Sequence, residues 1–100
     1  MRAALMTTAL MLCLGPAAEA GGPIERACNR SDRSAATPTL CDCLQRVADA
    51  TLKRREQRTA AKLFRDPDRA QEMRRSDRAR DEAFWQRYTY FGSAAELNCR

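Results

Sequence analysis

A clear apolar stripe with helical spacing begins at Leu40. Its members recur at the i, i+3, i+4 and i+7 positions that share one face of a helix: Leu40, Cys43, Leu44, Val47 and Thr51. Pro38 suits the first turn of a helix, where its missing N–H costs nothing, and Thr37 before it suits the N-cap. The pattern therefore predicts a helix from about Thr39 to Leu52.

A strongly basic segment follows, from Lys53 to Arg65, and it contains neither Gly nor Pro. It either continues the first helix or forms a second helix after a short kink. The positions that would supply its buried face are Leu52, Ala60, Leu63 and Phe64. Cations four positions apart, such as Arg54 and Arg58, destabilise an isolated helix by roughly a few tenths of a kcal/mol, so packing must supply the order.

The next helix start is marked by Asp66-Pro67-Asp68. Asp66 can cap the helix, Pro67 takes its first position, and Asp68 favours the positive end of the helix dipole. We expect a helix from Pro67 to about Arg75, with Ala70 and Met73 facing inward.

The last third of the chain predicts a helix that is capped by Ser76 and runs through Phe91. Gly92 then suits the left-handed residue that ends many helices. Three aromatic residues share one face of this helix: Phe84, Tyr88 and Phe91. Trp85 and Tyr90 lie off that face, so either is a candidate for exposure and binding.

A capping-box pattern, Ser93-Ala94-Ala95-Glu96, follows Gly92 and predicts a short terminal turn that carries Leu97 and Cys99. The aromatic stripe and the stripe of the first helix are too apolar to remain in water. We therefore expect the aromatic face to pack on Leu40, Leu44 and Val47, which brings Cys99 back toward Cys43.

The two N-terminal segments have other compositions. Residues 1–20 combine a basic Arg2, an apolar run from Ala3 to Leu14 that is short for a membrane span, and the small-x-small pattern Ala18-Glu19-Ala20. This predicts a secretory signal peptide cleaved after Ala20; an uncleaved N-terminal anchor is the alternative. Residues 21–37 hold one large apolar anchor, Ile24, and predict a loosely structured arm with a turn of helix near Cys28.

No alternating strand pattern, internal repeat or low-complexity tract occurs anywhere in the chain. The sequence predicts an all-α protein, with a small bundle of about four short helices over residues 38–100. Eighty mature residues form one domain with a thin core, and natural scaffolds of this size add covalent staples.

Five cysteines are present, and Cys13 lies in the predicted signal peptide. The remaining four, an even number in a small exported chain, favour two disulfides. Residues two apart do not share a helix face, so a Cys41–Cys43 bond is disfavoured, and each is better placed to bond Cys28 or Cys99. Two pairings remain; because Cys43 lies nearer the centre of the apolar stripe, we favour Cys43–Cys99 with Cys28–Cys41.

The chain carries a net charge of +5, which signal cleavage leaves unchanged because one basic and one acidic residue depart. The basic segment predicts an exposed binding face for an acidic protein or an anionic envelope surface: Arg54, Arg55, Arg58, Lys62 and Arg65. The alternative is a solvated helix face in an arginine-rich protein. Nucleic acid is a weaker partner, since acidic residues after Asp66 dilute the charge.

The chain has no histidine, which excludes histidine-based catalysis and most zinc and copper sites. It also has no Gly-rich phosphate loop. We therefore expect no enzymatic activity, no cofactor and no metal. The competing interpretation assigns Cys41 and Cys43 to thiol–disulfide exchange or to thiolate metal binding.

Several strings together resemble a family of small exported proteins from alphaproteobacteria that contain Cys-x-Cys and have no known function. They are Cys28-Asn29-Arg30-Ser31, Cys41-x-Cys43 followed by Gln45-Arg46-Val47-Ala48-Asp49, Ala61-Lys62-Leu63-Phe64-Arg65-Asp66-Pro67, Arg75-Ser76-Asp77, and Phe84-Trp85-x-Arg87-Tyr88-x-x-Phe91-Gly92. The resemblance covers nearly the whole mature chain. Some members carry the label "arginine transporter", for which an eighty-residue chain without a membrane-spanning bundle offers no basis, and the family has no established site residues. The resulting expectation is a periplasmic or secreted, non-transmembrane protein that acts by binding.

Overall fold

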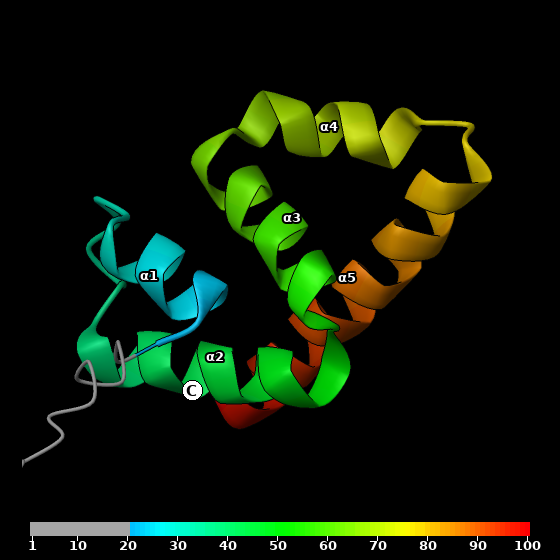
Figure 1. Ribbon diagram of the computed structural model, residues 1–100. Helices are drawn as coiled ribbons and strands as arrows, with labels where there is room; N and C mark the ends of the chain where they lie inside the picture. The colour runs from blue at the N-terminus through cyan, green and yellow to red at the C-terminus, as the bar shows by residue number, and fades with distance from the viewer. Residues whose placement is uncertain (1–20) are drawn as a thin grey trace, which may run out of the picture.

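A computed structural model describes residues 21–100, and over this range the chain is all-helical, as predicted. The helices are α1 (Pro23–Asn29), α2 (Pro38–Thr51), α3 (Arg54–Arg65), α4 (Pro67–Arg75) and α5 (Ala79–Asn98). Helix α1 packs on α2 and α3. Helices α3, α4 and α5 run along three sides of a triangle, and the C-terminal part of α5 packs on α2 (Figure 1). The predicted signal peptide, residues 1–20, lies outside the described range.

Two helix starts follow the local capping chemistry. The Thr37 hydroxyl accepts a hydrogen bond from the Leu40 N–H at 3.1 Å, and Pro38 opens α2. The Asp66 carboxylate accepts one from the Arg69 N–H at 3.2 Å, and Pro67 opens α4. These hydrogen bonds confirm both predicted caps. Each cap involves residues three positions apart, which is why the sequence alone could predict it.

The basic segment forms its own helix. Leu52 and Lys53 adopt extended conformations that separate α2 from α3, so of the two alternatives the kinked one is present. The Lys53 N–H donates to the Glu56 carboxylate at 3.1 Å and thereby satisfies one of the free groups at the start of α3.

The predicted helix end at Gly92 is wrong. Helix α5 continues through Gly92 and Ser93 to Asn98, and Gly92 does not have a positive φ. A glycine inside a helix costs about 1 kcal/mol relative to alanine. The continuous helix offsets that cost by burying Phe91 and Ala95, which lie four residues apart on one face.

Ser76 is also not the cap of α5, which begins after Arg78. The Ser76 hydroxyl instead accepts from the Arg78 N–H at 3.3 Å and donates to the Asp81 carboxylate at 2.7 Å. Ser76 therefore lies before α5 and stabilises its first turn through these two hydrogen bonds.

The core lies where α1, α2, α3 and α5 meet. Its buried members are Ile24, Ala48, Leu52, Ala60, Leu63, Phe84, Phe91 and Ala95. Tyr88 is half-buried between the two phenylalanines, with ring centroids 5.8 Å from Phe84 and 6.2 Å from Phe91. The expected packing of α5 on α2 is present, with Leu44 and Val47 against the core, whereas Leu40 lies outside it.

The turn of helix expected near Cys28 is present as part of α1, which is longer than one turn. Helix α1 is docked by Ile24, which is completely buried, and by a hydrogen-bonded contact with α2. The side-chain oxygen of Gln45 accepts from the Ile24 N–H at 2.9 Å and from the Glu25 N–H at 3.0 Å. Gln45 thus caps a helix 21 residues earlier, a contact that no local pattern encodes.

Replacing Gln45 by Ala is expected to destabilise the fold by about 2 kcal/mol. The change removes the acceptor for the Ile24 N–H and the 2.8 Å hydrogen bond that Gln45 donates to the buried Gln57. A buried polar group left without a partner costs about 1–3 kcal/mol. Urea unfolding followed by circular dichroism measures the loss. Gln86→Ala, on the exposed side of α5, is the matched control, and an equal effect of both variants would contradict this account.

Candidate functional site

The two disulfides join α2 to both ends of the described chain. Cys28 is bonded to Cys41 and Cys43 to Cys99, with Cα–Cα distances of 5.5 Å and 5.7 Å. This is the pairing favoured from the sequence. Cys41 and Cys43 project to opposite flanks of α2, one toward α1 and the other toward the end of α5.

This arrangement opposes the redox interpretation. Each half of Cys41-x-Cys43 is bonded to a distant partner, so the two sulfurs do not form a dithiol pair. Cys41 is completely buried, which keeps an attacking thiolate from its sulfur. Between residues 21 and 100, no group of three or more His, Cys, Asp or Glu side chains is placed to hold a metal ion.

Helix α3 brings the five predicted cations together on one side. At 3.6 residues per turn, they fall within an arc of about 100° around the helix axis. We call this set the cationic arc: Arg54, Arg55, Arg58, Lys62 and Arg65, all of them exposed. None of them forms an ion pair with another part of the chain that the structure describes.

The one acidic residue of α3, Glu56, faces the opposite way and is 8% exposed. Its carboxylate accepts hydrogen bonds from the Lys53 N–H and from the Arg87 guanidinium of α5. Burial alone raises the pKa of Glu56, but these two donors outweigh it, and the net effect lowers the pKa below its ordinary value. Glu56 is therefore ionised at neutral pH and paired with Arg87, so it does not offset the cationic arc.

Sequence reasoning missed Glu56 and the adjacent buried Gln57. The expected inward positions were Leu52, Ala60, Leu63 and Phe64; the first three are buried and Phe64 is partly buried. The spacing of Glu56, four residues before Ala60 and seven before Leu63, was the available indication. The sequence pattern could not indicate the ion-pair partner of Glu56, because Arg87 is 31 residues away.

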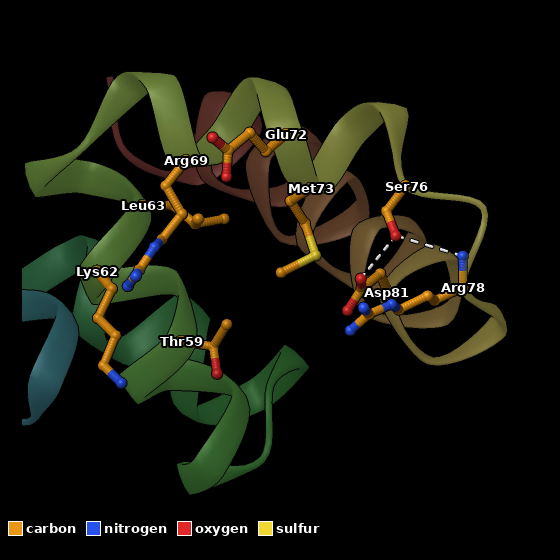
Figure 2. Close-up of a pocket in the computed structure, with 9 residues that line it drawn as sticks. All are labelled: Thr59, Lys62, Leu63, Arg69, Glu72, Met73, Ser76, Arg78 and Asp81. Carbon is orange, nitrogen blue, oxygen red and sulfur yellow. Dashed lines mark hydrogen bonds between the residues drawn. The ribbon is translucent and has the colours of Figure 1, made fainter.

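An open pocket of about 480 Å³, called the cavity below, lies between α3, α4 and the start of α5 (Figure 2). Lys62 belongs to the cationic arc and also lines this cavity. Figure 2 shows the Arg69 side chain running from α4 toward α3, with Lys62 beside it, and Met73 pointing into the space between the helices. The hydrogen bond between Ser76 and Asp81 closes the opposite side.

The two aromatic residues off the α5 stripe differ in exposure. Trp85 is partly buried and packs against the core. Tyr90 is 67% exposed, and Leu97, seven residues further along the same side of the helix, is 78% exposed. Both are single exposed apolar side chains on α5.

Comparison with protein-family models, curated proteins and solved structures finds no match for this chain. Among the helices of residues 21–100, none is both long and apolar enough to cross a membrane. The fold and site define a class: a small all-helical protein with two disulfides and one strongly cationic helix face.

Proposed function

We propose that this protein binds an anionic phospholipid surface through the cationic arc of α3. The observation that carries the proposal is the separation of charge on this helix. Five exposed cations without ion-pair partners occupy one side, and the only acid is turned inward and neutralised by Arg87. A helix arranged this way presents uncompensated positive charge to solvent.

The shape of the cationic arc favours a headgroup surface over an acidic protein. Twelve residues form a straight row roughly 18 Å long. The arc itself contains no aromatic side chain, so it lacks the buried Trp and Tyr anchors in which protein interfaces concentrate much of their affinity. A layer of anionic headgroups requires only charge, at about 1 kcal/mol for each Lys or Arg near the surface.

The proposal includes the compartment. Two disulfides are typical of an oxidising environment, and the N-terminal pattern is typical of a signal peptide cleaved after Ala20. We place the mature protein in the periplasm or outside the cell, in the exported family that its motifs resemble. There it acts by binding and not by catalysis.

The test is sedimentation with vesicles of phosphatidylglycerol, and of phosphatidylcholine for comparison. Arg54→Gln, Arg58→Gln and Arg65→Gln together are expected to weaken binding to phosphatidylglycerol roughly a hundredfold, from about 1 kcal/mol for each charge. Added salt should weaken binding of the native chain, because exposed charges are screened beyond about 8 Å at physiological ionic strength.

The matched control removes the same charge elsewhere: Arg30→Gln, Arg74→Gln and Arg75→Gln, which are exposed and lie outside α3. Equal weakening by both triple variants would show that net charge, not the cationic arc, determines binding. Indifference to salt would contradict the proposal. Failure to bind either vesicle combined with binding to polyglutamate would replace the lipid surface by an acidic protein partner.

A further inference from the structure

The cavity between α3, α4 and the start of α5 has the size of a small-molecule site. Its volume of about 480 Å³ lies within the range of ligand pockets, about 300–1,000 Å³. A second hollow of about 370 Å³ adjoins it and shares Thr59, Met73 and Asp81 with it. The two together form an elongated space between the helices.

The charges around the cavity favour an anion. Each of its three walls supplies one cation: Lys62 from α3, Arg69 from α4, and Arg78 from the turn before α5. None of the three forms an ion pair within residues 21–100. Two carboxylates, Glu72 and Asp81, also line the cavity, so its lining keeps one net positive charge; Asp81 accepts a hydrogen bond from the neutral Ser76 hydroxyl at 2.7 Å.

The same cavity also offers apolar contacts. Met73 of α4 extends into its middle in Figure 2, and Leu63 of α3, which is 2% exposed, borders it with the edge of a buried side chain. The adjoining hollow continues this surface to Phe84 of α5. Methionine is unbranched and adapts its shape to irregular apolar partners.

Helix α4 is the least anchored element that borders the cavity. It has no buried residue, and its only packing against the core comes from the partly buried Ala70 and Met73. An apolar ligand lying between Met73 and Phe84 would supply the packing that the α4 side chains leave unmade.

We propose that this cavity binds a single-chain amphiphile with an anionic head, such as a fatty acid or an alkyl phosphate. The head lies at Arg69, whose guanidinium reaches α3 beside the base of the Lys62 side chain in Figure 2, and the chain lies along Met73 where it borders Leu63 and Phe84. This site goes beyond the proposed membrane contact, because Arg69 and Met73 are not part of the cationic arc.

Calorimetry with dodecanoate below its critical micelle concentration tests the site on the native, disulfide-bonded chain. Saturable binding is expected for dodecanoate or dodecyl phosphate, and comparing them shows which head group the site prefers. Acetate has the head without the chain, and dodecyltrimethylammonium has the chain with the opposite charge; neither is expected to bind. The fluorescence of Trp85, the single tryptophan, provides a second measurement, because Trp85 and Met73 line a neighbouring hollow.

Arg69→Gln is expected to weaken dodecanoate binding about tenfold or more, the effect of losing one hydrogen bond to a charged group. Arg65→Gln, an exposed cation of α3 outside the cavity wall, is the matched control and should leave this binding unchanged. The reverse holds for phosphatidylglycerol vesicles, where Arg65 contributes through the cationic arc. The two proposals can therefore fail separately.

Met73→Ala tests the apolar half of the site and should also weaken dodecanoate binding. Far-UV circular dichroism of each variant, with and without ligand, shows that the helices are retained. Three outcomes would overturn the proposal: no saturable binding to the native chain, equal weakening by Arg65→Gln and Arg69→Gln, or binding of dodecyltrimethylammonium as strong as that of dodecanoate.

Discussion

Removing the Cys43–Cys99 disulfide, by Cys43→Ala with Cys99→Ala, is expected to lower the free energy of unfolding by about 4 kcal/mol. The bond closes a loop across 56 positions of sequence and joins α2 to the end of α5. In the chain-entropy model, a cross-link of that length restricts the unfolded chain by about 4 kcal/mol. Total stability of small domains is about 5–15 kcal/mol, so much of the folded population should be lost on warming.

Urea unfolding of the double variant measures the effect, and a free-thiol count on the native protein checks that no cysteine is reduced. The control is Cys28→Ala with Cys41→Ala, which opens a loop across 13 positions. It should cost about 3 kcal/mol from chain entropy. A native chain whose melting temperature is indifferent to strong reductant would show that neither bond contributes to stability.

Truncating Phe91 to Ala is expected to cost about 3–5 kcal/mol, the range for a buried phenylalanine whose cavity cannot fully collapse. Phe91 is 3% exposed and Phe84 is 6% exposed, and both lie in the core where α5 crosses the other helices. Phe84→Ala should have a comparable effect. Thermal and urea unfolding measure both.

The matched control is Tyr90→Ala, which alters the adjacent residue on the exposed side of the same helix. Its effect should lie within about 0.5 kcal/mol, as for most surface substitutions, and Arg80→Ala should behave likewise. If Phe91→Ala and Tyr90→Ala cost the same, the aromatic stripe is not the core of this domain.

The features that sequence reasoning predicted correctly have local causes. The caps at Thr37 and Asp66 involve hydrogen bonds between residues three positions apart. The cationic arc follows from the helical repeat of one uninterrupted segment. A local fact also disfavoured a Cys41–Cys43 bond, since these residues cannot share a helix face. The position of Cys43 nearer the centre of the apolar stripe then favoured the pairing that is present.

The features that it missed or mistook involve a balance between local and distant interactions. Gly92 carries a local stop pattern, yet the burial of Phe91 and Ala95 keeps α5 helical through it. Residues 21–37 look weakly apolar, yet one buried isoleucine, one disulfide and the Gln45 cap hold α1 in place. In both cases tertiary contacts supply free energy that the neighbouring residues do not encode.

By itself, the sequence determined an all-helical chain, where α2 and α4 begin, that Cys41 and Cys43 bond different partners, and that five cations share one side of a helix. Only the tertiary structure decided that Glu56 is neutralised by Arg87, that α5 runs unbroken to Asn98, and that α3, α4 and α5 border an open pocket with a cation from each side. The physical reason is the distance along the chain over which each kind of interaction acts. Capping and periodicity act within one or two turns of a helix, whereas a buried ion pair and a cavity depend on side chains brought together from distant segments.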